Sequence, residues 1–349
     1  MDSFNVKEFC QKLPKVELHA HLNTSYSVKS IQELIQLNGS AGELEEVNIA
    51  TNQDIDESFK FFTKIQQLVK TEEAVYLLTR SVIEEFAADN VKYLELRSTP
   101  KDIPETGMTR ELYMNTMIRA VKECQDKGLD IIVRLLVSFD RRHGIDIAKL
   151  TVELAEKLMK DHGGLINGID LSGDPKVGDA TDLIPYLIEA GKKNLKLALH
   201  LAELPSHAET KNVLSALCQE GSLSLRIGHG TFLYRHEDGL GCDEMRDLVL
   251  QKKIPIEACI TSNLKTKTVN SIESHHFKYW FQQGHPIILC TDGKGVYDST
   301  LSEEYWKAAQ AFSLSREQLK DCVHKAIDSI FAEDSVKEVL RQKLNEFHI

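Results

Sequence analysis

The sequence lacks a cysteine pattern typical of a disulfide framework or a thiolate metal site. Its seven cysteines are an odd number, spread from Cys10 to Cys322, and no two of them form a Cys-x-x-Cys pair. Scattered cysteines of this kind are typical of reduced thiols in the cytosol. We therefore expect a cytoplasmic protein that has no disulfide framework.

Long apolar runs and an excess of basic residues are also missing. No apolar segment approaches the roughly 20 residues of a membrane-spanning helix, and the acid at Asp2 argues against a secretory signal. The 42 Lys and Arg residues face 53 Asp and Glu residues, which gives a net charge of −11. This is the wrong sign for neutralising nucleic-acid phosphates. We expect a soluble monomer that binds a small molecule, with neither membrane nor nucleic acid as a partner.

Internal repeats, low-complexity segments and linkers are absent, which favours one large domain over residues 1–349. This length exceeds that of most single cores, but α/β barrels reach it with insertions. Apolar, β-branched runs alternate with helical patterns, and eight such units predict an α/β fold, a closed (β/α)8 TIM barrel. The eight runs lie at residues 15–22, 91–99, 130–139, 166–171, 195–201, 225–228, 254–260 and 286–290.

The first two predicted strands are separated by some seventy residues, far more than a usual βα loop. Helical patterns near 28–38, 57–70 and 72–88 fill this stretch. We expect residues 24–89 to be a helical lid insertion, although ordinary packing against the barrel rim explains the pattern equally well. The tail from residue 301 to 347 predicts a helical C-terminal extension, with capping-box spacings at Thr300/Glu303, Ser315/Gln318 and Ser335/Glu338.

A His-x-His pair at the end of the first predicted strand is the first sign of a metal site. His19 and His21 share one strand face, but an isolated pair of this kind needs partners before it predicts a metal. Catalytic groups of such barrels lie at the carboxyl ends of the strands, where this sequence also places His200 and Asp292. Three imidazoles and a carboxylate suit zinc, so we predict one Zn²⁺ per chain on these four residues. A second metal is not expected. Barrel hydrolases with two metals commonly bridge them with a lysine at the end of the fourth strand, and Leu171-Ser172-Gly173 offers none there.

Two further residues at the same ends are candidate catalytic groups. Glu203 falls in the loop above the predicted metal, where a carboxylic acid could donate a proton to a substrate nitrogen. A surface glutamate that opens the following helix is the alternative. His229 stands between Gly228 and Gly230 and could orient the attacking water or stabilise its charge. A lone histidine is usually structural, but the position at a strand end favours the catalytic interpretation.

Taken together, five stretches of the chain resemble the landmarks of the adenosine deaminase superfamily, in that family's order. Within the superfamily they are similar to the adenosine deaminase-like branch that acts on N6-methyl-AMP. The likeness runs from about residue 11 to past residue 330. The stretches are LPKVELHAHLN (13–23), YLELRSTP (93–100), GIDLSGD (168–174), RIGHGT (226–231) and CTD (290–292).

This resemblance implies a mononuclear zinc hydrolase in which zinc hydroxide adds to C6 of a 6-aminopurine, and ammonia or an alkylamine leaves. Glu203 would protonate ring N1, His229 and Asp292 would position the hydroxide, and the Gly173 amide would hold the other side of the purine. The cytidine-deaminase type of zinc site is excluded, because its Pro-Cys-x-x-Cys signature is missing.

Asn23 points to a nucleotide as the substrate of such an enzyme. Relatives that take the free nucleoside carry an aspartate here, which would repel a 5′-phosphate, whereas an amide can donate to it. The predicted reaction therefore converts N6-methyl-AMP to IMP and methylamine. Thr99, Lys101 and Arg142 could supply further donors or could be solvated loop residues. The predicted substrate-binding residues are His21, Asn23, Gln66, Ser98, Thr99, Pro100, Lys101, His143, Gly173 and Gly293.

Three substrate-side residues depart from the family pattern. Gly293 stands where the family has a second aspartate that hydrogen-bonds purine N7, Thr24 replaces a usual glycine, and Gln66 falls near a usual histidine. A missing buried hydrogen-bond partner costs about 1–3 kcal/mol, so we expect reduced activity. Two alternatives follow: an adenosine deaminase that acts on the free nucleoside, and a weakened or inactive purine-nucleotide binding protein.

Overall fold

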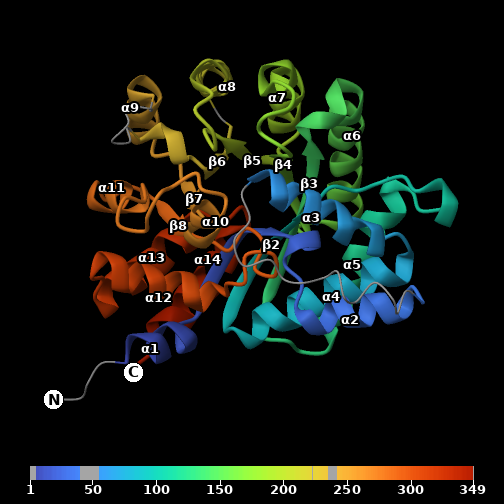
Figure 1. The fold of residues 1–349 in the computed structure, drawn as a ribbon, viewed down its shortest axis with the longest axis horizontal. Coiled ribbons are helices and arrows are strands. Elements are labelled where there is room, and N and C mark those ends of the chain that lie inside the picture. Colours follow the sequence, from blue (N-terminus) through green and yellow to red (C-terminus); the bar gives the residue numbers. More distant parts are fainter. Residues whose placement is uncertain (1–4, 40–54, 222, 235–241, 349) are drawn as a thin grey trace.

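The computed structural model describes residues 5–39, 55–221, 223–234 and 242–348, and its centre is one parallel sheet of eight strands. The strands follow one another in chain order, from β1 to β8, and in Figure 1 they lie inside a ring of helices. This is the predicted (β/α)8 barrel. The strands are β1 (Lys15–His21), β2 (Val91–Ser98), β3 (Ile132–Asp140), β4 (Ile166–Ser172), β5 (Lys196–Leu201), β6 (Leu225–His229), β7 (Ile256–Ala258) and β8 (Ile287–Leu289).

Helices cover the outside of the barrel, and none of those described is long and apolar enough to cross a membrane. Three of them, α2 to α4, lie between β1 and β2, as predicted, while residues 40–54 of that insertion fall outside the described part. The helices are α1 (Val6–Lys12), α2 (Val28–Leu37), α3 (Ile55–Leu68), α4 (Glu72–Ala88), α5 (Arg110–Asp126), α6 (Gly144–His162), α7 (Ile184–Lys192), α8 (His207–Gln219), α9 (Asp243–Lys252), α10 (Ile260–Lys265), α11 (Phe277–Gln282), α12 (Leu301–Phe312), α13 (Arg316–Asp328) and α14 (Asp334–Asn345).

Two local predictions need correction. The capping boxes at Thr300 and Ser315 are confirmed, but α14 begins at Asp334, so Ser335 lies inside its first turn and caps nothing. The seventh strand is shorter than the apolar run suggests, because Ile260 already begins α10. The polar residues after that strand therefore sit on a short helix rather than in a loop.

The barrel closes at the carboxyl end of β1. Asp292, just beyond β8, forms a parallel bridge with Ala20 of β1. The Asp292 N–H donates to the His19 carbonyl at 2.8 Å, and the His21 N–H donates to the Asp292 carbonyl at 2.9 Å. The same backbone bonds that join the first and last strands thus set the spacing of three predicted metal ligands.

A layer of paired charges fills the barrel interior below these residues. Arg97 donates to Asp170 at 2.9 Å and to Glu257 at 3.0 Å, while Arg226 donates to Glu257 at 2.6 Å and also pairs with Glu95. All five side chains are almost fully buried. Buried charges are tolerated when they are paired and hydrogen-bonded, as here, so the layer ties together β2, β4, β6 and β7.

Candidate active site

A cavity of about 860 Å³, including the solvent at its mouth, opens at the carboxyl ends of the strands. Concave sites at this end of a barrel are where small-molecule ligands bind. Glu203, His229, His200 and Asp292 line it, and His19 lies fully buried beside His200 and His229. Six predicted substrate-side residues also line it: His21, Asn23, Gln66, Ser98, Thr99 and Gly173. The other four are outside this lining: Pro100, Lys101, His143 and Gly293.

Left-handed backbone turns mark the ends of three strands at this cavity. Ala202 after β5, His229 at the end of β6 and Asp292 after β8 have φ values of 51°, 62° and 62°. Residues with a side chain rarely adopt this conformation, and such strain is concentrated at functional sites. The turns interrupt the alternation of side chains along the strands, and Glu203, His229 and Asp292 all reach the same cavity.

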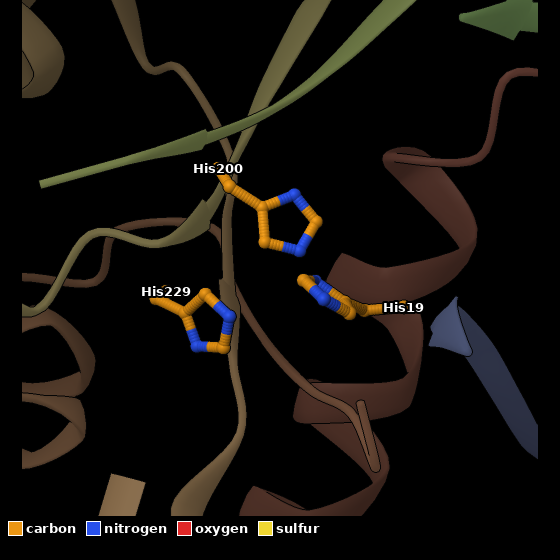
Figure 2. A group of neighbouring side chains, drawn as sticks. All are labelled: His19, His200 and His229. Carbon is orange, nitrogen blue, oxygen red and sulfur yellow. The ribbon is translucent and has the colours of Figure 1, made fainter. Parts of the chain in front are cut away.

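The ring nitrogens of the predicted metal site converge. Figure 2 shows His19, His200 and His229 turned toward one another, and their ligand atoms lie within 4.8 Å. His21 Nε2 lies 3.1 Å from His200 Nε2, and Asp292 Oδ1 lies 3.6 Å from His21 Nε2 and 3.7 Å from His19 Nε2. The structure therefore gathers the four predicted ligands and adds His229 beside them.

Of the three predicted histidine ligands, two are neutral and the third is protonated. Burial lowers the pKa of His19 well below its usual value and that of His21 to about 3, so both imidazoles are neutral. Burial also acts to lower the pKa of His200, but the Asp170 carboxylate raises it to about 9. His200 Nε2 thus carries a proton that points at His21. This proton occupies the place where a metal cation would lie. The buried Nε2 of His19 has no hydrogen-bond partner among the described residues.

The opposite nitrogens of two of these rings are held as donors. His19 Nδ1 lies 2.8 Å from Glu257 Oε2, and His200 Nδ1 lies 2.7 Å from the Leu171 carbonyl. Such partners orient histidine ligands and leave Nε2 for a metal. Ser262 Oγ donates to Asp292 Oδ2 at 2.7 Å. Glu257 and Ser262 could not be assigned to the site from the sequence, because their partners lie far away in the chain.

A cysteine also lies near the cluster. Atoms of His19, Cys259 and Asp292 also lie within 4.8 Å of one another. Burial raises the pKa of the Cys259 thiol well above its usual value, which disfavours the thiolate that binds metals. The four residues predicted from the sequence remain the better donor set.

A chain of hydrogen bonds fixes the tautomer of His229. The Phe277 N–H donates to His275 Nδ1 at 3.0 Å, so His275 Nε2 carries the proton and donates to Asn263 Oδ1 at 3.1 Å. The Asn263 amide in turn donates to His229 Nδ1 at 3.3 Å. His229 Nε2 therefore carries a proton into the cavity, where it is a donor rather than a metal ligand.

Glu203 lies opposite that donor, with Oε1 3.8 Å from His229 Nε2. Burial raises its pKa to about 7, and the charge of His200 acts in the opposite direction. The charges of Asp292 and Asp174 raise the pKa further, and that of Arg141 lowers it. Near neutral pH a substantial fraction of Glu203 is therefore the neutral acid, the form that a proton donor needs.

On the substrate side, Asn23 shares a small network with two side chains of β2 and α5. Its amide nitrogen lies 3.5 Å from the Tyr113 hydroxyl, which lies 2.8 Å from Ser98 Oγ. Asn23 Oδ1 is buried and has no partner among the described residues. Because a tyrosine hydroxyl both donates and accepts, rotating the amide would turn either its oxygen or its nitrogen toward a ligand. Sequence reasoning missed Tyr113.

One more polar pair stands at the cavity. Arg142 Nε donates to Asp140 Oδ1 at 2.9 Å, and both residues are part of the lining. Gly173 lies against this pair: its φ is 102°, and a Cβ would come within 2.1 Å of Asp140 Oδ1. Only glycine fits there, which accounts for the Ser-Gly-Asp sequence after β4.

Comparisons with known proteins agree with this architecture. The adenosine deaminase family model matches residues 14–347. The chain is 45% identical over 337 residues to the N6-methyl-AMP deaminase of Danio rerio, covering 96% of this chain and 95% of that one. It is 43% identical over 341 residues to the N6-methyl-AMP deaminase of Homo sapiens, covering 97% and 94%.

Solved structures give the same result. A crystal structure of Arabidopsis ADAL complexed with GMP has a TM-score of 0.86 and 38% identity, and the match covers 97% of this chain and 98% of that one. A structure of the ADAL-IMP complex also has a TM-score of 0.86 and 38% identity, with coverage of 97% and 98%. The chain therefore belongs to the adenosine deaminase family, and it is a hydrolase of the deaminase type.

Proposed function

We propose that the protein is a zinc-dependent aminohydrolase that converts N6-methyl-AMP to IMP and methylamine. The observation that carries the proposal is the meeting of the His19, His21 and His200 imidazoles with Asp292 and the acid Glu203 at one cavity. Relatives named N6-methyl-AMP deaminase, and ADAL structures that hold IMP or GMP, support a purine nucleotide as the ligand.

The residues that would hold the metal are His19, His21, His200 and Asp292. When bound, zinc would supply Lewis-acid activation of the attacking water, whose pKa it lowers toward 7. Loss of the His200 Nε2 proton would accompany metal binding, because a ligand nitrogen must present its lone pair. We expect one metal ion per chain.

The remaining chemistry falls to the chain itself. Glu203 would donate its proton to ring N1, which makes C6 a better electrophile and leaves a carboxylate that takes a proton from the attacking water and so regains its acid form. The proton on His229 Nε2 would orient the water oxygen and stabilise the charge that develops on it. The Gly173 N–H would hold the far side of the purine. Water thus supplies the oxygen at C6, and methylamine leaves with the second proton.

Selectivity for the 5′-phosphate would come from the end of the cavity near Asn23. Its amide can donate to a phosphate oxygen, and Ser98, Thr99 and Arg142 line the same cavity. An aspartate at position 23 would place a negative charge beside the phosphate and repel it. Asn23 therefore favours the nucleotide over the nucleoside.

The helical insertion of residues 24–89 would act as a lid of the single barrel domain. The Phe62 ring of α3 lies 6.5 Å from the Tyr297 ring, across the cavity lining, and Gln66 of α3 accepts a hydrogen bond from Lys101. Helix α3 is thus in contact with the loops that follow both β8 and β2. Opening these two contacts would admit the nucleotide.

The test is turnover of four substrates by the zinc-loaded protein: N6-methyl-AMP, AMP, N6-methyladenosine and adenosine. Loss of the 6-amino substituent changes the ultraviolet spectrum, and chromatography identifies IMP. We expect the highest kcat/KM for N6-methyl-AMP and a preference for the monophosphates. The Asn23→Asp variant should lose that preference, by about ten-fold or more, while its nucleoside turnover is retained. Equal turnover of nucleosides and monophosphates by the unmodified protein would contradict the phosphate assignment.

A second candidate is a purine-nucleotide binding protein with little catalysis, which the glycine at position 293 favours. This candidate predicts that IMP binds to the protein while no 6-aminopurine changes its spectrum, even at high protein concentration. The two candidates are therefore separated by the same set of measurements.

A further inference from the structure

Gly293 is a glycine because of its neighbour rather than because of its own backbone. Its φ lies outside the left-handed region, so a residue with a side chain could adopt the conformation. A Cβ at this position would lie 2.6 Å from Thr24 Oγ1, 2.7 Å from Thr24 Cβ and 3.3 Å from the Thr24 carbonyl oxygen. Contacts below 3.0 Å are not seen for real Cβ atoms. The Thr24 side chain therefore occupies the space that a side chain at position 293 would need.

Thr24 cannot easily move away. It ends the short turn Leu22–Thr24 that follows β1, and its side chain is buried. Its carbonyl accepts hydrogen bonds from the Gly295 N–H at 3.0 Å and the Val296 N–H at 3.1 Å. These bonds fix Thr24 to the loop that carries Gly293. Thr24 is thus held against Gly293 at the wall of the cavity.

Of the two, Thr24 is the residue that reaches the cavity. It belongs to the lining, while Gly293 does not. Its hydroxyl lies 3.3 Å from the His21 carbonyl, a long contact that a better acceptor could replace by rotation of the side chain. A hydroxyl can donate to an aromatic ring nitrogen and brings no third carboxylate next to Asp292 and Glu203.

We propose that Thr24 and Gly293 are a matched pair, and that the Thr24 hydroxyl recognises the purine base by donating a hydrogen bond to N7. The second part rests on the proposed function, since it needs a purine in the cavity. It makes Thr24 a specificity-determining residue of this chain. The family pattern assigns the hydrogen bond to N7 to an aspartate at position 293. In this chain Thr24, which contacts position 293, would make that bond instead.

The pairing is tested by a double-mutant cycle on thermal stability, which does not depend on activity. The four proteins are the unmodified chain, Gly293→Ala, Thr24→Gly and the double variant. We expect Gly293→Ala to lower the melting temperature by several degrees and to have little effect once Thr24 is glycine, because the space is then free. If Gly293→Ala does not fold, recovery of a folded double variant supports the pairing. Equal effects of Gly293→Ala in both backgrounds would overturn it.

The hydroxyl is tested by calorimetric binding of IMP and of 7-deaza-IMP, in which a C–H replaces N7. The unmodified protein should bind IMP roughly three- to ten-fold more tightly, as expected for one neutral hydrogen bond. Thr24→Ser should keep this preference, and the isosteric Thr24→Val should lose it with unchanged zinc content. A preference that survives in Thr24→Val, or its absence in the unmodified protein, would overturn the assignment to N7.

These measurements separate the inference from the proposed function. Binding selectivity without any turnover would refute the aminohydrolase but keep Thr24 as the base-recognising group. Turnover of N6-methyl-AMP together with equal binding of IMP and 7-deaza-IMP would support the aminohydrolase but refute the assignment of Thr24 to N7. In an active enzyme, Gly293→Asp alone should lower kcat/KM, and combining it with Thr24→Gly should restore activity toward the unmodified level.

Discussion

At the scale of single residues, the protonation of Glu203 governs the proposed chemistry. Burial raises its pKa to about 7, so the acid form declines as the pH rises through that value. Only the acid form can protonate ring N1, and kcat/KM should therefore fall above about pH 7. Measuring kcat/KM from pH 5 to 9 tests this. The charges that face Glu203 are those of His200, Asp292, Asp174 and Arg141, and a change at any of them would shift the curve.

The matching variant is Glu203→Gln, which keeps the shape but cannot donate a proton. General acid catalysis contributes about 10²–10⁴-fold, so kcat should fall by that factor and the decline above neutral pH should disappear. Zinc content and IMP binding serve as the controls and should remain close to those of the unmodified protein. Retention of more than a tenth of the activity would exclude Glu203 as the proton donor.

Asn263 is a positioning residue, because it acts through the tautomer of His229. In Asn263→Asp, a carboxylate oxygen would accept from His229 Nδ1, and the proton on Nε2 would be lost from the cavity. We expect kcat to fall by on the order of 10²–10⁴-fold with KM little changed, as for other histidines forced into the wrong tautomer. Nitrogen-15 NMR of the imidazole would report the change directly.

Thr268→Val is the control for that variant, since Asn263 also donates to Thr268 Oγ1 at 3.1 Å. Removing this second bond leaves the contact with His229 in place. Activity close to that of the unmodified protein is expected. If the two variants lost activity equally, the effect would be a general disturbance of α10 and not a tautomer change.

At the scale of elements, the strands are tied together inside the barrel by Glu257 of β7. It accepts from Arg97 of β2 and Arg226 of β6 and also holds His19 of β1. The charge-removing variant Glu257→Gln would leave two buried guanidinium groups undercompensated, at a cost of about 3–5 kcal/mol in the free energy of unfolding. Urea denaturation measures this loss.

An exposed ion pair provides the comparison. Glu244 of α9 pairs with Lys211 of α8 at 2.7 Å, and both side chains are mostly exposed to solvent. Glu244→Gln should therefore change the free energy of unfolding by less than about 1 kcal/mol. Similar losses in the two variants would mean that the interior layer is not what joins the strands.

At the scale of the whole molecule, the proposed metal links the first and last strands, because its ligands come from β1, β5 and the residue that closes the barrel. A ligand that binds only the folded state stabilises it by about 4 kcal/mol at 1,000 times its dissociation constant. Removing zinc with a chelator should therefore lower the melting temperature by roughly 5 °C. Calorimetry on the holo and chelated proteins tests this.

The control for chelation is His200→Ala, which lacks one proposed ligand. Its melting temperature should respond little to the chelator, since it starts with little bound zinc. Restoring zinc to the chelated unmodified protein should return both its melting temperature and its activity. A melting temperature that does not respond to chelation in the unmodified protein would argue against a metal held by these four residues.

The sequence by itself determined the barrel and most of the residues around its cavity. Alternating apolar runs and helical patterns repeat eight times, and in a parallel sheet all carboxyl ends must meet on one side. His19, His21, His200 and Asp292 could therefore be grouped without any coordinates. Local signals of this kind depend on spacing along the chain, and spacing is what a sequence displays directly.

Only the tertiary structure decided which distant groups touch. The hydrogen bonds that orient His229 pass through Asn263 and His275, the contacts of Glu257 span four strands, and Thr24 meets Gly293 nearly 270 residues away in the chain. The sequence marked Thr24 and Gly293 as two separate departures from the family pattern. The Thr24 side chain occupies the volume that a side chain at position 293 would need. This contact exists only once the barrel has closed, because closure at Asp292 brings the two ends of the sheet together.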